Sequence, residues 1–238
     1  MKYVRDTTGR FQQRPHYEPD ELDVECERII KPFLKDLYGE IKYPVQTEDL
    51  KKLIERDADD LDVYADLTGY GLEVEGVTEF RPGKKPSVSI SAELTEDDRR
   101  ENRLRTTLTH EYGHVRFHAY LWEIEPPSAD LLRQQPNRDK IICKRDTMID
   151  AVQTDWMEWQ AGYICGALLM PKSAVIGLCR EHIEANGIYG PVSLQSPAGS
   201  QIIQTIVKAF QVSQDAARVR LLKLGLATAA AETKNLFG

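Results

Sequence analysis

Most hydrophobic residues of this chain recur every three or four positions, the spacing that places them on one face of an α-helix. This period predicts helices over 21–37, 47–54, 95–121, 155–170, 172–185, 202–210 and 217–224. Three short stretches instead suit strands: 71–77 and 87–90 alternate hydrophobic and polar residues, and 141–143 is a brief hydrophobic run. The pattern therefore predicts an α+β fold that is rich in helices and contains a small antiparallel sheet.

Polar and flexible stretches divide the chain into four parts. Residues 1–19 show no hydrophobic period and predict a mobile arm ahead of a main domain over 20–186. A linker containing Gly and Pro, 187–199, leads to a C-terminal module over 200–238. Two short helices about a tight turn make this module resemble a helix-turn-helix.

Two local features change this outline. Pro32 is expected to kink or divide the first helix, because proline lacks the N–H that a helix interior uses. The acidic residues between 57 and 62 are expected to form a solvated loop, because they lack the glycine and the spacing of a calcium-binding loop.

The composition is that of an ordinary soluble globular protein. The chain has 238 residues, 41% of them hydrophobic and 29% charged, and its net charge of −7 argues against a general nucleic-acid binder. No secretory signal is visible, and no run approaches the ~18 apolar residues of a membrane span. The four cysteines form no C-x-x-C pair. These features predict a protein of the reducing cytoplasm that does not contact membranes.

Residues 110–114 form an H-E-x-x-H motif inside the helix predicted over 95–121. Residues four apart on a helix share one face, with Cβ atoms about 5–6 Å apart, so His110 and His114 can converge on one metal ion. Glu111 can then reach a metal-bound water, which is the position of a general base. Zinc suits the set best, because it takes imidazole ligands and keeps an open position for water. The motif predicts a zinc hydrolase.

Two further residues of this helix bear on the site. His118 continues the histidine face but lies about 11 Å from His110 along the axis. A straight helix cannot bring both to one zinc, so His118 is expected to support or pack against the site. Gly113 costs about 1 kcal/mol relative to Ala inside a helix, which indicates that another element approaches closely there.

A catalytic zinc needs a third protein ligand, and spacing alone does not determine which residue supplies it. Glu158 stands at one end of a stripe of small residues in the helix over 155–170, namely Ala161, Gly162, Cys165 and Gly166. Asp155, one turn earlier, is the closest competitor. Five other acids occupy less suitable positions: Glu123, Glu125, Asp139, Asp146 and Asp150. Cys143 could block zinc or act as a redox thiol, but a small packed residue is the preferred interpretation.

Three separated segments resemble the ImmA/IrrE family of metallo-endopeptidases, over about residues 45–226. Residues 102–118 resemble the family's catalytic helix. Residues 158–171 resemble its second signature, an E-x-(E/Q)-A stretch that ends in L-L-M-P, and residues 210–221 resemble the helical module that often follows.

The resemblance implies a Zn²⁺ ion held by His110, His114 and Glu158, with Glu111 as the general base. It also implies a substrate, because members of this family typically cleave helix-turn-helix repressors of mobile elements or stress responses. The basic residues of the C-terminal module leave direct DNA contact open, but protein recognition or packing is the preferred interpretation. Those residues are Lys208, Arg218, Arg220 and Lys223.

The sequence thus predicts a zinc-dependent metallo-endopeptidase that cleaves a cytoplasmic protein, with a helix-turn-helix repressor as the expected target. The alternative is a repressor-binding or DNA-binding regulator whose zinc site is structural or inactive. No oxyanion-stabilising residue can be assigned from the sequence, although Tyr112, Tyr163 and His118 are candidates.

Overall fold

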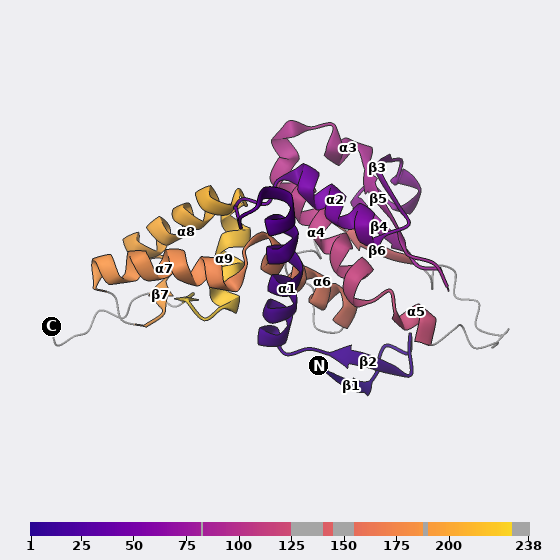
Figure 1. Ribbon diagram of the computed structural model, residues 1–238, viewed down its shortest axis with the longest axis horizontal. Helices are drawn as coiled ribbons and strands as arrows, with labels where there is room; N and C mark the ends of the chain where they lie inside the picture. The colour runs from indigo at the N-terminus through magenta and orange to yellow at the C-terminus, as the bar shows by residue number, and fades with distance from the viewer. Residues whose placement is uncertain (82, 125–139, 145–154, 188–189, 230–238) are drawn as a thin grey trace.

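The computed structural model describes residues 1–81, 83–124, 140–144, 155–187 and 190–229, and it shows an α+β protein (Figure 1). The helices are α1 (Pro19–Tyr38), α2 (Thr47–Asp57), α3 (Ala92–Thr95), α4 (Glu101–Phe117), α5 (Leu121–Ile124), α6 (Trp156–Leu169), α7 (Lys172–Asn186), α8 (Pro197–Phe210) and α9 (Gln214–Lys223). The strands are β1 (Lys2–Arg5), β2 (Gln13–His16), β3 (Asp60–Ala65), β4 (Val74–Glu79), β5 (Ser87–Ser91), β6 (Lys140–Lys144), β7 (Val192–Ser193) and β8 (Ala227–Thr228). Short 3-10 turns η1 (Thr68–Tyr70) and η2 (Asp98–Arg100) complete the described elements.

The main sheet has the strand order β3-β5-β4-β6. Its strands β5 and β6 both run antiparallel to β4, and the three correspond to the strands predicted over 87–90, 141–143 and 71–77. Helix α4 packs against this sheet, and α2 and α6 pack against α4 (Figure 1). The helix that carries the H-E-x-x-H motif is therefore enclosed on several sides.

The acidic stretch expected to be a solvated loop instead supplies strand β3. Asp60, Asp62 and Tyr64 point to solvent, while Leu61, Val63 and Ala65 alternate with them and are partly buried. This period-two pattern is that of a half-buried strand, and the aspartates that obscure it are simply its exposed face. Because β3 pairs with β5 in parallel, the sheet is mixed rather than wholly antiparallel.

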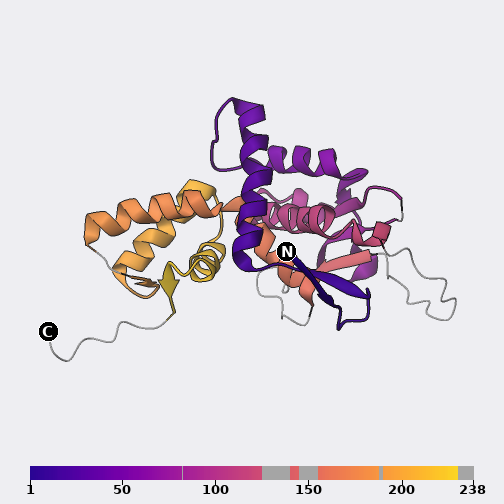
Figure 2. The ribbon, with the colours of Figure 1, turned by 60° about the horizontal axis from the view of Figure 1, so that its bottom comes forward.

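The N-terminal segment expected to be a mobile arm forms an antiparallel hairpin of β1 and β2 (Figure 2). The buried Asp6 organises its turn, because its carboxylate accepts hydrogen bonds from the backbone N–H groups of Thr8 and Phe11, each at 3.0 Å. Phe11 is buried and packs edge-on against Trp122, with ring centroids 4.9 Å apart. One buried aromatic residue and one turn-forming carboxylate thus replace the hydrophobic period that this segment lacks.

The helix boundaries differ from the predictions in two places. Pro32 lies inside α1 without dividing it, because it sits on the exposed face, where water can bond the carbonyl that proline leaves unpaired. The segment predicted as one helix over 95–121 is broken into α3, η2, α4 and α5. Asp97 causes the first break, because its side chain accepts from the N–H of Arg99 and starts a new turn.

Helix α6 is apolar on nearly all sides and is largely buried. Pro171 follows it and serves as the N-cap of α7. Among the described residues, no single helix is long and apolar enough to cross a membrane, although α6 and α7 meet that criterion together across a 58° bend.

Helices α7, α8 and α9 lie on the opposite side of α1 from the main sheet (Figures 1 and 2). They share a hydrophobic core with the rest of the chain. Helix α8 begins at Pro197, inside the expected linker, because Ser196 caps it by accepting from the N–H of Gly199. The same linker supplies β7, which pairs with β8 in parallel. The expected boundaries at 199 and 200 therefore fall inside an ordered unit.

Two buried arginines join this unit to the main body. Arg105 of α4 donates to the carbonyls of Val45 at 2.8 Å and of Phe210, the last residue of α8, at 3.1 Å. Arg220 of α9 donates to Asp23 at 2.6 Å and to the carbonyl of Met170 at 3.0 Å. The sequence leaves DNA contact open for Arg220, but this residue is 2% exposed and forms an internal ion pair.

Candidate metal centre

His110 and His114 lie on the face of α4 that meets α6, as their spacing predicts. Both are fully buried, and their Nε2 atoms are 3.1 Å apart. Glu158, in the first turn of α6, places Oε2 3.2 Å from Nε2 of His110 and Oε1 3.2 Å from Nε2 of His114. The structure therefore brings together the three residues that the family resemblance implies as ligands.

Small residues allow the two helices to approach this closely. A Cβ atom added to Gly113 would lie 3.2 Å from Cα of Ala161 and 3.5 Å from its Cβ. Any larger residue at position 113 would push α6, and Glu158 with it, away from the histidines. The costly glycine in α4 therefore marks a close approach, as the sequence predicted, and the structure shows that Ala161 of α6 makes it.

The spacing of the three donors fits a tetrahedral metal ion. Ligand atoms bound 2.0–2.1 Å from a tetrahedral zinc are about 3.3–3.4 Å apart, close to the 3.1–3.2 Å between the donors here. Two imidazoles and a carboxylate are also the donor set of many catalytic zinc sites. The residues present thus fit a zinc ion.

The charges of these groups attract a positive charge to the site. Burial raises the pKa of Glu158, but His110 and His114 outweigh burial and hold that pKa well below its usual range. Burial lowers the pKa of His110, but the facing carboxylate of Glu158 outweighs it and the net pKa is raised. The buried Glu158 carboxylate is therefore balanced by a positive charge, which a proton on His110 or a metal ion that displaces this proton can supply.

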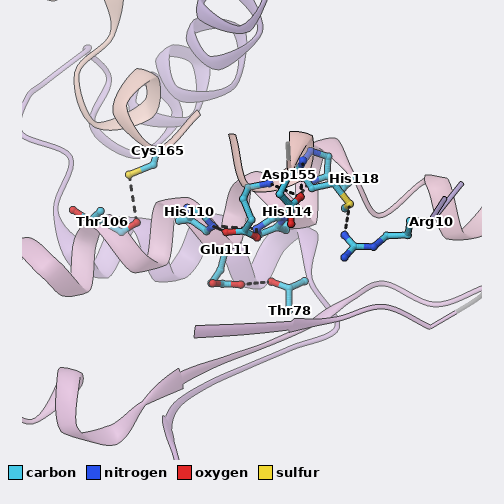
Figure 3. A network of polar contacts seen from close by, with 11 residues as sticks. Arg10, Thr78, Thr106, His110, Glu111, His114, His118, Asp155 and Cys165 are labelled. Carbon is cyan, nitrogen blue, oxygen red and sulfur yellow. Dashed lines mark hydrogen bonds and ion pairs between the residues drawn. The ribbon is translucent and has the colours of Figure 1, made fainter. Parts of the chain in front are cut away.

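Glu111 points away from the ligand set, toward strand β4 (Figure 3). Its Oε2 accepts a hydrogen bond from the hydroxyl of Thr78 at 2.5 Å, and both residues are fully buried. Burial raises the pKa of Glu111 above its ordinary value, and His114, His110 and Thr78 offset only part of that rise. A buried carboxylate with a raised pKa next to the ligands suits a residue that accepts and returns a proton. The sequence carried no signal for Thr78, which lies 33 positions before Glu111.

Gly76, two residues before Thr78, makes room for Glu111. A Cβ atom at position 76 would lie 2.8 Å from the carboxyl carbon of Glu111, closer than real Cβ contacts allow. We expect Gly76→Ala to displace Glu111 from Thr78 and to lower turnover by about 10²-fold, the usual cost of misplacing a catalytic group by about 1 Å. Because the three atoms nearest to the added Cβ all belong to Glu111, zinc content should remain stoichiometric, as metal analysis of the purified variant would show.

Gly177→Ala provides the matched control for that change. Gly177 lies on the exposed face of α7, and a Cβ atom there would meet nothing within 4 Å. Its turnover should equal that of the wild type. Equal turnover of Gly76→Ala and Gly177→Ala would show that Glu111 does not need this space.

His118 lies beside His114 rather than at the metal position, as its distance along the helix predicts. Its Nδ1 is 3.0 Å from Nδ1 of His114, and its Nε2 is 3.0 Å from Oε1 of Gln160. Burial, and then the proximity of His114, lower the pKa of His118 well below its usual value. In the sequence, Gln160 stands out only as the (E/Q) position of the second signature, where no role was assigned to it.

Cys143 is closer to the site than the preferred sequence interpretation allowed. Its sulfur and the nearest donor atoms of His110 and Glu158 all lie within 4.8 Å of one another, so these three buried residues form a group that could hold a metal ion. Burial, and then Glu111, raise the pKa of this thiol well above its ordinary value. Cys143 lies near the ligands because β6 pairs with β4 and places Cys143 opposite Gly76. No local sequence pattern predicts this pairing of the two strands.

The other candidate acids do not reach the ligand group. Asp155 is the N-cap of α6, where its side chain accepts from the N–H groups of Met157 and Glu158 at 3.2 and 3.4 Å. Glu123 is exposed on the short helix α5. The remaining three aspartates and one glutamate lie outside the described residues: Glu125, Asp139, Asp146 and Asp150.

Two candidate oxyanion stabilisers are engaged elsewhere. The hydroxyl of Tyr112 donates to Asp57 at 2.6 Å, and that of Tyr163 donates to Asp23 at 2.9 Å.

Comparison of the chain with models of known protein families finds no match, and comparison with curated proteins finds none.

Proposed function

We propose that this protein is a zinc-dependent metallo-endopeptidase that hydrolyses a peptide bond in a cytoplasmic protein. The observation that carries the proposal is the convergence of His110, His114 and Glu158, with the separate carboxylate of Glu111 held beside them by Thr78. A site with three ligands and an adjacent, uncommitted carboxylate has the parts that metal-assisted hydrolysis requires.

Each residue has a distinct role in this reaction. A zinc ion bound by the three ligands would lower the pKa of a water molecule toward ~7 and polarise the scissile carbonyl group. Glu111 accepts the proton of the attacking water and passes it to the leaving amine, and its raised pKa makes the first of these transfers easier. Thr78 keeps the Glu111 carboxylate in place between the two transfers.

For the substrate we propose a helix-turn-helix repressor, which rests on the resemblance to ImmA/IrrE peptidases. Direct DNA binding by α9 has less support. Arg220 is buried in an ion pair, Lys223 packs over the ring of Tyr163 at 5.4 Å, and Arg218 pairs with Asp215 on the surface.

Cys143 favours a second candidate function, a regulator with a structural zinc site. A thiolate that joined the two histidines and Glu158 would complete a four-coordinate set, and closed sets of this kind are structural rather than catalytic. The proximity of its sulfur to His110 and Glu158 is the observation that supports this candidate.

One experiment on the full-length protein separates the two functions. Cobalt replaces zinc in such sites and gives a thiolate-to-metal charge-transfer absorption only where a cysteine is bound. The peptidase function predicts that this absorption is absent during turnover. It also predicts metal-dependent cleavage of helix-turn-helix regulators, and any regulator that is encoded beside this gene should be tested first. Chelation should stop the cleavage, zinc should restore it, and mass spectrometry of the products should show a single site.

The structural-zinc function predicts the opposite pattern. The peptidase proposal would be overturned by three results together. These are strong thiolate absorption that Cys143→Ser abolishes, stoichiometric zinc, and no cleavage by the wild type or by Cys143→Ser. Cleavage by the wild type that Cys143→Ser leaves intact would instead remove the thiol from consideration as an obligatory ligand.

A further inference from the structure

A buried line of hydrogen bonds leads from the N-terminal hairpin to His114. The side-chain N–H of Gln160 donates to the carbonyl of Pro15 at 3.0 Å, and its Oε1 lies 3.0 Å from Nε2 of His118. Nδ1 of His118 lies 3.0 Å from Nδ1 of His114. The three side chains in this line are at most 1% exposed, so water does not compete for these bonds.

The direction of each hydrogen bond follows from the group at the hairpin end. A carbonyl can only accept, so the amide nitrogen of Gln160 must face Pro15 and its oxygen must face His118. That oxygen can in turn only accept, so Nε2 of His118 carries a proton.

Nδ1 of His118 in turn determines which nitrogen of His114 carries a proton. Neither contact of the buried His118 carries a negative charge that would balance an imidazolium, so its ring is neutral and its Nδ1 is an acceptor. His114 must therefore donate from Nδ1. Its Nε2 is left with a lone pair, and this is the atom that lies 3.1 Å from Nε2 of His110 and 3.2 Å from Glu158.

We propose that Gln160 is a positioning residue that sets the tautomer of His114 through His118 and so prepares Nε2 of His114 to bind a metal. A metal-binding histidine needs its lone pair on the side of the metal, and a partner for its other nitrogen fixes that choice. The ligand role of His114 rests on the proposed function, whereas the tautomer is a property of the chain itself.

The N-terminal hairpin takes part in this arrangement because it is attached to the first turns of α6. Asp6 accepts from the indole N–H of Trp156 at 3.2 Å. Arg10 contacts the sulfur of Met157 at 3.0 Å (Figure 3). These contacts involve the two residues just before Glu158, and they hold the Pro15 carbonyl opposite Gln160. The segment first expected to be a mobile arm is thus the far end of the line that reaches the metal site.

The test uses the full-length, metal-depleted protein with ¹⁵N-labelled histidines, together with two variants. In the wild type, NMR should place the proton of His114 on Nδ1 and that of His118 on Nε2. Gln160→Leu removes the acceptor that orders these protons, so His114 should populate the other tautomer. Its zinc affinity, measured by competition with a chromophoric chelator, should fall about 10–100-fold, the usual cost of losing a partner of a metal ligand.

The second variant, His118→Phe, is tested alone and combined with Gln160→Leu, because it removes the ring through which Gln160 acts. The combined variant should bind zinc no more weakly than His118→Phe alone. A proton on Nε2 of wild-type His114 would overturn the proposal without reference to any variant. A further loss of zinc affinity when Gln160→Leu is added to His118→Phe would also overturn it, because it would indicate a packing role. None of these readings requires peptide cleavage, so a failed peptidase assay would leave them unchanged.

Discussion

Replacing Glu158 with alanine is expected to leave the purified protein without stoichiometric zinc. The change removes the one described carboxylate that contacts both histidines, at 3.2 Å from each Nε2. Two imidazoles on one helix then remain, fewer than the three protein ligands that catalytic zinc sites use. The fold should persist, because Glu158 sits in the first turn of α6 and the contact between Gly113 and Ala161 does not depend on it.

Asp155→Ala is the matched control on the same helix. Asp155 caps α6, so its loss should cost about 1 kcal/mol of stability and leave zinc content close to one per chain. The sequence analysis expected Asp155 to be the closest competitor of Glu158, and the structure makes it a helix cap instead. Elemental analysis of both purified variants is the measurement.

Full zinc in Glu158→Ala would contradict the ligand assignment. Cys143 gives that outcome a specific meaning, because its sulfur could complete a set of two histidines and one thiolate. A double variant of Glu158→Ala and Cys143→Ser identifies this case, since zinc retained by the single variant and lost by the double variant would assign the third ligand to the thiol.

The parts of the site that lie on one helix could be predicted from the sequence. The spacing of His110 and His114 follows from helical geometry, and the cost of a glycine at 113 correctly indicated a close neighbour. The small-residue stripe of α6 was a second local signal, but only the structure shows that α6 is that neighbour. Both signals are local, because they depend on the period of a single helix.

The parts that depend on pairing between distant segments could not be predicted. Thr78 and Gly76 reach Glu111 because β4 lies against α4, and Cys143 reaches the ligands because β6 pairs with β4. The side-chain amide of Gln160 donates to a backbone carbonyl 145 positions away. An ordinary threonine, glycine or glutamine carries no sign of such contacts until the topology is known.

The errors in the fold have a similar cause. In β3 the exposed aspartates obscured an alternation whose inward half consists of Leu61, Val63 and Ala65. The N-terminal hairpin has only one large buried hydrophobic residue, Phe11, and its turn is held by Asp6 rather than by a hydrophobic period. In both segments polar residues form part of an ordered element, and the hydrophobic period of the sequence does not show this.

Glu111→Gln is expected to keep the zinc and the fold but to reduce turnover by at least ~10²–10⁴-fold, the contribution of general acid–base catalysis. The amide has the shape of the carboxylate, and its oxygen can still accept from Thr78, so the local packing is preserved. It cannot accept the proton of the attacking water. Because the pKa of Glu111 is raised by burial, replacing it with a neutral group also removes a charge that is costly to bury, so the melting temperature should not fall.

Tyr112→Phe is the control for this change, because it alters the next residue of the same helix without touching the site. The Tyr112 hydroxyl bonds to Asp57, at the end of α2, so its loss should affect stability more than turnover. Zinc content, melting temperature and the rate of product formation by mass spectrometry would be measured for both variants. Normal cleavage by Glu111→Gln would exclude Glu111 as the base. Loss of zinc from Glu111→Gln would instead place Glu111 among the ligands, and the proton acceptor would then have to be sought elsewhere in the site.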